Sequence, residues 1–297
     1  MSVHPYDKLM SRLAKGERIL IDGATGTEIE RRGVPQLDNA WNGGGALSHP
    51  DVLRSVHEDY IREGAEIVIS NTFATSKHAL IDAAVEDQFE AFNRRGVELA
   101  CEARSRQHRP DVLVAGGISY WSWSGRHPSL GDLRASVEEQ AAIMAGAGAD
   151  LLMLEMMVDI DRMLVTLEAA QTGGLPVWVG LSCKPDDSGT MTLWNGDRLV
   201  DALDALESRS VPLVSIMHTE VAYIDDCLDL LRRRWPGPIG VYAHSARWVD
   251  NKCIYDGTIS PEDHAAHANA WLDAGAQIIG GCCGMGIDHI KALKPLV

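Results

Sequence analysis

Several features are missing from this sequence, and each absence narrows the class of protein it can be. No apolar run in its 297 residues is long enough to cross a bilayer, so we expect no membrane-spanning segment. The first residues, MSVHPYDKLMSRLAKGE, lack the apolar core of a secretory signal, so we expect a cytoplasmic protein. Only six cysteines occur, which are too few for a disulfide scaffold, and we expect them to be reduced thiols.

Positive charge is scarce as well. The chain has 27 Lys and Arg against 42 Asp and Glu, which gives a formal net charge of −15. Because its one basic cluster is the short LRRRW segment, nucleic acid is not an expected partner. No linker or low-complexity tract divides the chain, so we expect a single domain over residues 1–297. The sequence gives only weak grounds for a homo-oligomer.

What the sequence does contain is a regular alternation of short apolar runs with longer amphipathic stretches. Eight runs rich in Val, Ile and Leu occur at residues 18–23, 66–70, 111–118, 150–156, 176–183, 212–218, 238–244 and 276–283. Such runs are typical of buried parallel strands, and the stretches between them resemble capped helices. The pattern predicts an α/β protein, a single (β/α)8 TIM barrel. A doubly wound open sheet is the alternative, although GATGTE matches its phosphate-binding turn only weakly.

Polar and thiol residues stand at the predicted carboxyl ends of these strands. Barrel enzymes build their sites at that end of the barrel. The residues found there are Asp22, Gly23, Asn71, Thr72, Gly117, Glu155, Cys183, His218, His244, Cys282 and Cys283. Solubility alone does not require polar residues after so many apolar runs. The sequence therefore predicts a functional site at the mouth of the barrel.

The adjacent pair Cys282 and Cys283 is the sharpest feature of that set. A disulfide between neighbours is not expected, because successive Cα atoms lie about 3.8 Å apart and a disulfide usually spans about 4.4–6.8 Å. Three interpretations of the pair remain: the cysteines bind a metal, they act as reactive thiols, or they are buried as small hydrophobic residues. A catalytic Zn²⁺ site takes three protein ligands and keeps a fourth position open. The third ligand would then come from another strand, with Cys183, His218, His244 and Cys253 as the candidates.

Six segments carry a resemblance to a known family. They are DGATGTE (22–28), SNTFATS (70–76), LLMLEM (151–156), SCKPDDSGTMTLWNG (182–196), YAHSARW (242–248) and GGCCGMGIDHIKAL (280–293). In them the chain resembles the zinc-dependent homocysteine S-methyltransferases, which are (β/α)8 barrels, over nearly its whole length. That family ligates zinc through a glycine-flanked Cys-Cys pair and through a third cysteine in an Asn-Cys dipeptide ending the sixth strand. The resemblance implies Zn²⁺ as cofactor, with Cys282 and Cys283 as ligands.

The third ligand is where the sequence departs from the family. Met217 and His218 stand in place of the Asn-Cys dipeptide. Histidine also binds zinc, so a site made of His218, Cys282 and Cys283 is chemically reasonable. Exchanging a thiolate for a neutral imidazole makes the site less negative by one unit. The metal becomes a stronger Lewis acid, and a bound substrate thiolate is held more firmly but is less nucleophilic.

The resemblance also implies residues that bind an amino-acid substrate. Asp22 and Gly23 match the family's N-terminal motif, which contributes to that binding. Glu155 ends an apolar strand, where an unpaired carboxylate is costly, and we expect it to bind the ammonium of the acceptor. Asp22 and Glu155 are the predicted catalytic residues. Asn71 and Thr72 are expected to line the pocket or to tie loops together by hydrogen bonds.

Tryptophans follow several of the predicted strands and bear on the methyl donor. Aromatic faces attract sulfonium and quaternary ammonium groups, so Trp41 and Trp121 are predicted to contact a cationic donor. The alternative is that loop tryptophans simply pack over the barrel mouth. Arg247 follows the seventh strand and is predicted to pair with a substrate carboxylate.

The predicted reaction is methyl transfer from a cationic sulfonium or betaine-type donor to a small-molecule thiol such as homocysteine, giving methionine. Zn²⁺ would stabilise the acceptor as a thiolate at neutral pH. Two alternatives come from other classes. One is a metal-dependent demethylase or C–S lyase acting on a methylated sulfonium compound. The other is a non-enzymatic zinc or thiol redox sensor, which would not need so many polar strand ends.

Overall fold

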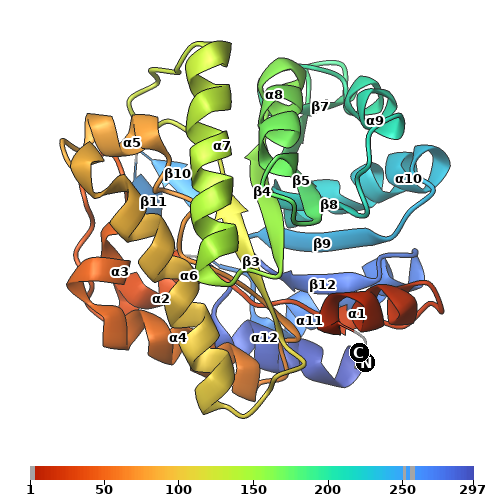
Figure 1. Cartoon of the computed structure of the whole chain (residues 1–297). Helices are drawn as coiled ribbons and strands as arrows, with labels where there is room; N and C mark the ends of the chain where they lie inside the picture. The colour runs from red at the N-terminus through yellow and green to blue at the C-terminus, as the bar shows by residue number, and fades with distance from the viewer. Residues whose placement is uncertain (1–3, 250–251, 255–257) are drawn as a thin grey trace.

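Eight parallel strands form one continuous sheet (Figure 1) in the computed structural model, which describes residues 4–249, 252–254 and 258–297. For 247–249 and 252–253 it describes the backbone only. The strands run in the order β1-β12-β9-β8-β5-β4-β3-β2. Their bounds are β1 (Ile19–Leu20), β2 (Ile67–Ile69), β3 (Leu113–Ile118), β4 (Leu151–Met157), β5 (Val177–Leu181), β8 (Val214–Glu220), β9 (Ile239–His244) and β12 (Ile278–Gly281).

Backbone hydrogen bonds also join the two end strands of this sheet. The Asp22 N–H donates to the Ile67 carbonyl at 3.0 Å, and the Glu66 N–H donates to the Leu20 carbonyl at 2.8 Å. These bonds connect β1 to β2 and close the sheet into a ring. The predicted single (β/α)8 barrel is confirmed, and the doubly wound open sheet is wrong, because an open sheet leaves its end strands unpaired.

Helices surround the ring and return the chain from one strand to the next (Figure 1). They are α1 (Pro5–Leu13), α2 (Thr25–Arg31), α3 (Gly45–Ser48), α4 (Pro50–Arg62), α5 (Lys77–Asp82), α6 (Phe89–Arg106), α7 (Leu130–Ala147), α8 (Ile160–Gln171), α9 (Leu199–Glu207), α10 (Ile224–Arg234), α11 (Pro261–Asp273) and α12 (Ile287–Leu293). Two hairpins are inserted at the carboxyl ends of strands, β6 (Cys183–Pro185) with β7 (Met191–Leu193) after β5, and β10 (Arg247–Val249) with β11 (Lys252–Ile254) after β9. Short 3-10 turns are η1 (Asn42–Gly44), η2 (Glu86–Gln88), η3 (Val221–Tyr223) and η4 (Lys294–Leu296).

The helix ends follow from local sequence chemistry. The Ser129 hydroxyl accepts the Asp132 N–H at 3.1 Å at the start of α7, and the Ser260 hydroxyl accepts the Asp263 N–H at 3.0 Å at the start of α11. Each bond satisfies an amide that the helix itself leaves free. Helix α7 ends on Gly148 with φ of 102°, a left-handed conformation that glycine adopts without steric cost.

Helix α1 packs against the amino ends of the strands. The Tyr6 hydroxyl accepts a hydrogen bond from the Trp178 indole N–H at 3.1 Å, close to the start of β5. The Gln277 side chain, just before β12, donates to the Leu13 carbonyl at 2.6 Å. This end of the barrel is therefore covered, and the open end is the one at which the strands finish.

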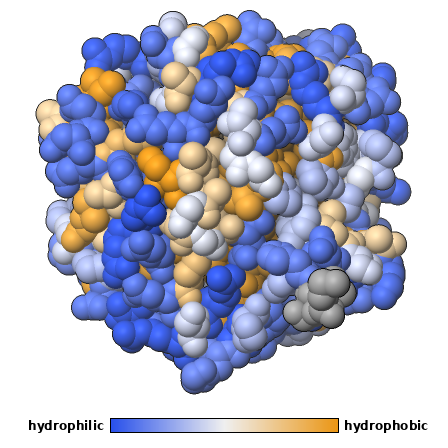
Figure 2. All heavy atoms as spheres, viewed as in Figure 1, coloured by the Kyte–Doolittle hydropathy of each residue, from blue (hydrophilic) through white to orange (hydrophobic). Residues whose placement is uncertain are grey.

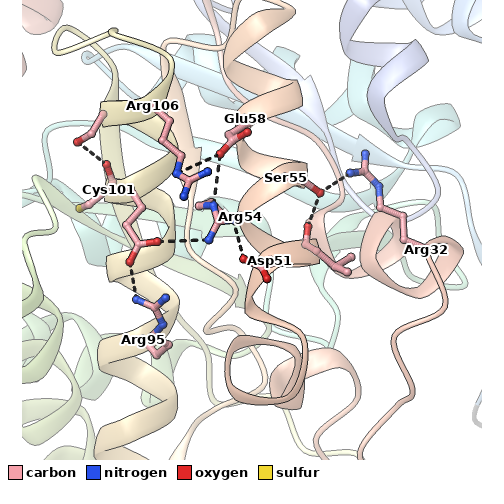
Figure 3. Close-up of polar contacts among 11 residues, drawn as sticks. Arg32, Asp51, Arg54, Ser55, Glu58, Arg95, Cys101 and Arg106 are labelled. Atoms are coloured by element: carbon pink, nitrogen blue, oxygen red, sulfur yellow. Dashed lines mark hydrogen bonds and ion pairs between the residues drawn. The ribbon is translucent and has the colours of Figure 1, made fainter.

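The outer surface is polar and charged. Figure 3 shows Arg54 of α4 paired with Asp51 and Glu58 of its own helix, and Arg54 also pairs with Glu102 of α6. Asp51 is 85% exposed, so its pair with Arg54 is screened by water and contributes at most about 1 kcal/mol. The face in Figure 2 is largely hydrophilic, with scattered apolar patches. In the part of the chain that the structure describes, no helix combines the length and the apolar composition needed to cross a membrane.

Candidate functional site

A pocket opens where the strands end. The carboxyl ends of β1, β2, β4, β8 and β12 each contribute at least one of the polar or thiol residues predicted from the sequence. Its lining residues are Asp22, Gly23, Ala24, Thr25, Gly26, Trp41, Gly43, Ile69, Ser70, Asn71, Phe73, Ala74, Trp121, Trp123, Glu155, Met156, Met217, His218, Tyr242, Gly281, Cys282 and Cys283. The predicted location of the site at the barrel mouth is where these residues meet.

Three potential metal ligands form a triangle on one wall of the pocket. His218 Nδ1 lies 3.6 Å from Cys282 Sγ and 3.5 Å from Cys283 Sγ, and the two sulfurs are 3.9 Å apart. A tetrahedral Zn²⁺ with bonds of about 2.3 Å to sulfur and about 2.0–2.1 Å to nitrogen holds two sulfurs about 3.8 Å apart and a sulfur–nitrogen pair about 3.6 Å apart. The three atoms already have the spacing of zinc ligands. His218, Cys282 and Cys283 are also the one such cluster among the described residues.

The backbone at His218 is held in an unusual conformation. His218 has φ of 43°, and the pairing of β8 with β9 shifts register between Met217 and Glu220. The Met217 carbonyl accepts hydrogen bonds from the Ser182 hydroxyl at 3.1 Å and from the Thr219 hydroxyl at 2.9 Å. A left-handed conformation costs about 1–3 kcal/mol outside glycine and persists where neighbours fix it. These two hydroxyls fix the irregularity that turns the imidazole toward the thiols.

The Cys-Cys loop is anchored on both sides. The Cys282 N–H donates to the Ala243 carbonyl at 2.8 Å, which ties the loop to the end of β9. On the other side the Thr27 hydroxyl accepts the Gly284 N–H at 3.2 Å, and Arg31 donates to the Gly284 carbonyl at 3.2 Å. Helix α2, which begins within the DGATGTE segment, therefore positions the loop that carries Cys282 and Cys283. This contact gives that segment a structural role.

The imidazole of His218 is in the state that a metal ligand requires. Burial lowers the pKa of His218 well below its usual value, and the neighbouring His244 lowers it further. The two rings meet edge to face, with centroids 4.4 Å apart. The pKa of His244 is itself lowered by burial to about 4. A ligand histidine must be neutral to offer its lone pair, and burial keeps both rings neutral at physiological pH.

Two buried carboxyl groups face the same pocket. Asp22 Oδ2 accepts the Ile69 N–H at 2.8 Å, and burial raises the pKa of Asp22 well above its usual value. Burial raises the pKa of Glu155 to about 8. Its Oε1 atom makes no hydrogen bond within the described chain, and it lies where a Cβ on Gly117 would stand. The barrel thus leaves room for a carboxyl group whose Oε1 atom no described residue satisfies, which is a strong sign of a ligand-binding role.

Aromatic rings form the outer wall of the pocket. Trp41 and Trp121 line it, as do Trp123 and Phe73, whose rings meet edge to face with centroids 5.8 Å apart. Trp41 has φ of 41°, and its ring packs so closely on Gly26 that a Cβ there would lie 2.6 Å from it. The local backbone is strained to place this indole at the pocket.

The remaining predicted residues have other surroundings. Asn71 lines the pocket and donates to the Asn42 carbonyl at 2.8 Å, whereas Thr72 is fully buried and donates to the Gly117 carbonyl at 2.7 Å. Cys183 is buried beside Cys227 and lies outside the ligand triangle. The side chains of Arg247 and Cys253 lie outside the described residues, so those two assignments stay predictions.

Sequence reasoning missed Tyr242 and Phe73, and it did not assign Trp123 or Ser70 to the pocket, although all four line it. Tyr242 lies inside an apolar strand, where an aromatic residue looks like core. Phe73 is inside the SNTFATS segment, and Trp123 is two residues beyond Trp121. Their closeness in sequence to predicted site residues was the feature that could have assigned them to the pocket.

Together the barrel, the thiol–imidazole triangle and the buried carboxyl groups define a (β/α)8 barrel protein with a candidate metal centre at its mouth. A family model described as homocysteine S-methyltransferase matches residues 19–297, and the chain belongs to that family. The predicted enzyme class, a methyltransferase, is confirmed by this membership.

Individual relatives agree with the family model. The chain is 27% identical to homocysteine S-methyltransferase 4 of Zea mays, with 94% of this chain and 89% of the relative covered. It is 26% identical to a selenocysteine methyltransferase of Astragalus bisulcatus, with 95% of this chain and 93% of the relative covered. Among solved structures, the metallated form of the homocysteine methyltransferase MmuM from Escherichia coli matches with a TM-score of 0.81, at 25% identity over 99% of this chain and 100% of that one.

Proposed function

We propose that this protein transfers a methyl group from a cationic donor to the thiol of homocysteine, giving methionine, in a Zn²⁺-dependent reaction. The observation that carries the proposal is the triangle of His218 Nδ1, Cys282 Sγ and Cys283 Sγ, whose separations of 3.5–3.9 Å match those of tetrahedral zinc ligands. When bound there, Zn²⁺ lowers the pKa of an acceptor thiol and supplies it as a thiolate at neutral pH.

The chain's own residues supply binding and orientation. Asp22 and Glu155 are the proposed partners of the ammonium group of an amino-acid acceptor. They would fix one end of the acceptor while its thiol reaches the triangle, and their burial at the pocket supports this assignment. An ammonium between two buried carboxylates also lowers their pKa values, because a nearby opposite charge favours the ionised form. Holding acceptor and donor in one small pocket removes the entropic cost of bringing them together.

The aromatic wall is the proposed donor side. Trp41 and Trp121, with Trp123 and Phe73 beside them, present ring faces and edges to the pocket. A sulfonium or quaternary ammonium group is attracted to such rings by about 0.5–2 kcal/mol per contact. S-methylmethionine, a betaine and S-adenosylmethionine are the candidate donors. A selenol acceptor is a reasonable extension, since relatives include a selenocysteine methyltransferase.

We also propose the cytoplasm as the location of the reaction. Cys282 and Cys283 must be reduced to bind a metal, and a reducing compartment keeps them so.

Product analysis tests the proposed function directly. Purified, zinc-loaded protein is incubated with homocysteine and each of the three donors, and the products are identified by mass spectrometry. With a betaine or S-adenosylmethionine we expect one methionine for each donor demethylated; with S-methylmethionine, which itself becomes methionine when it loses a methyl group, we expect two methionines for each homocysteine consumed. Donor consumption without an equal loss of homocysteine would contradict methyl transfer.

A further inference from the structure

Tyr242 has a hydroxyl that no described residue satisfies. The residue lies on β9, paired in register with Met217 of β8 and Gly280 of β12, and its side chain is 3% exposed. Its Oη atom makes no hydrogen bond within the described chain. Leaving a buried hydroxyl unpaired costs about 1–3 kcal/mol, so a protein retains one where something else provides a partner.

The barrel makes room for this hydroxyl. A Cβ on Gly180 of β5 would lie 2.9 Å from the Tyr242 oxygen, so the phenol reaches across β8 to a gap above β5. Glu155 on β4 also has an unpaired oxygen over a glycine, in this case Gly117 of β3. Glu155 and Tyr242, which both line the pocket, thus each hold a buried oxygen atom over a glycine, and neither oxygen has a partner among the described residues.

The electrostatic surroundings of the phenol identify the partner it lacks. Burial raises the pKa of Tyr242 well above its usual value, and the acidic groups of Glu155, Cys282 and Asp22 raise it further, in that order. The phenol is therefore neutral and lies among groups that become negative. No lysine or arginine is present among the described residues that line the pocket. A cationic hydrogen-bond donor fits this position, whereas a carboxylate would be repelled from it.

We propose that the Tyr242 phenol oxygen binds the ammonium group of the acceptor and makes the site specific for thiols that carry an α-amino group. An ammonium has three N–H donors, and Asp22, Glu155 and Tyr242 offer three oxygen atoms from three different strands or strand ends. This inference rests on the proposed function, because it assigns a partner to the acceptor of that reaction. Tyr242 is a specificity residue here, and it takes no part in moving the methyl group.

The test compares two thiols that differ only in the amino group. Homocysteine and 4-mercaptobutanoate share the thiol, the chain length and the carboxylate. Their dissociation constants are measured by calorimetry on zinc-loaded wild type and on Tyr242→Phe, in the absence of any donor. We expect the substitution to weaken homocysteine binding about 10-fold, the size of one hydrogen bond to a charged group, and to leave 4-mercaptobutanoate binding unchanged.

Tyr6→Phe is the matched control. Its hydroxyl accepts a hydrogen bond from Trp178 at the covered end of the barrel, far from the pocket. We expect it to lose folding stability without changing either dissociation constant. Tyr242→Phe should keep its folding stability and its zinc content, because the hydroxyl it removes has no partner among the described residues.

Three results would overturn the assignment of Tyr242. They are an equal loss of binding for both thiols, no loss for either, and wild type that binds homocysteine no better than 4-mercaptobutanoate. The assay measures binding without turnover, so these results are distinct from a failure to form methionine, which would count against the proposed function.

Discussion

Glu155 shows at the scale of one residue how the site opposes stability. Its native pKa is raised by burial to about 8, against a usual value near 4.5. Between these values the unfolded chain releases a proton that the native chain keeps. The contribution of Glu155 to stability is therefore fully present below about pH 4.5 and is lost as the pH rises toward 8. A residue that lowers stability at neutral pH is consistent with a role in binding.

Replacing Glu155 with glutamine removes this penalty. We expect Glu155→Gln to exceed wild type in unfolding free energy by about 4 kcal/mol at pH 8, and to match it at pH 4, where the wild-type carboxyl is neutral in both states. Denaturant unfolding between pH 4 and pH 9 measures the difference. Glu220→Gln, at the exposed end of β8, is the control and should show no such trend. A stability difference that does not vary with pH would contradict the raised pKa.

At the scale of the element, the strands and helix ends were predictable because they follow from local sequence. Nearly continuous Val, Ile and Leu runs encode buried parallel strands, and serine caps such as Ser129 encode helix starts. The polar residues that end those strands indicated the pocket, because parallel strands finish at one end of a barrel.

Other features of the elements depend on neighbours distant in sequence. The left-handed conformation of His218 is fixed by Ser182 and Thr219, and the inward direction of Tyr242 depends on the gap over Gly180. No local pattern encodes such contacts. They become visible only when β5, β8 and β9 lie side by side.

Gly280, two residues before the Cys-Cys pair, is required by the packing of β12 on β1. A Cβ on Gly280 would lie 2.6 Å from the Asp22 carbonyl oxygen and 3.0 Å from that of Ile21, so the backbone would have to shift. We expect Gly280→Ala to lower unfolding free energy by about 2–4 kcal/mol and to weaken zinc binding, because β12 carries the ligand loop. Chemical denaturation and chelator competition measure the two effects.

The matched control is Gly146→Ala, in helix α7, where an added Cβ meets nothing within 4 Å. We expect this variant to be as stable as wild type or more stable by up to about 1 kcal/mol, since alanine favours a helix over glycine. Equal stability of the two variants would show that a side chain at position 280 is tolerated despite the close approach of β12 to β1.

At the scale of the whole molecule, buried neutral histidines predict acid sensitivity. His57 of α4 and His264 of α11 have no hydrogen-bond partner for either ring nitrogen among the described residues, and burial lowers their pKa values to about 4 and about 3. Each is neutral in the native state but protonated in the unfolded chain below about pH 6.5. Their contribution to stability is present above that pH and is lost as the pH falls toward the native pKa values.

In the variant His57→Leu, one fewer proton is taken up on unfolding in acid, so its unfolding free energy should fall less steeply with decreasing pH. We expect wild type to lose about 3 kcal/mol more than the variant when the pH falls from 7 to 4, as measured by unfolding in urea. His267→Gln, at an exposed position of α11, should retain the wild-type slope. Parallel pH profiles for wild type and His57→Leu would contradict a buried neutral ring.

The central claim for the whole molecule is that strands β8 and β12 together hold one zinc ion through His218, Cys282 and Cys283. Zinc per chain, measured by plasma mass spectrometry after dialysis against a weak chelator, tests it most directly. Cys282→Ala serves as the reference for loss of a ligand. We predict one zinc per wild-type chain and little or none in either His218→Ala or Cys282→Ala, while a His218→Ala protein that keeps one zinc per chain would contradict the claim.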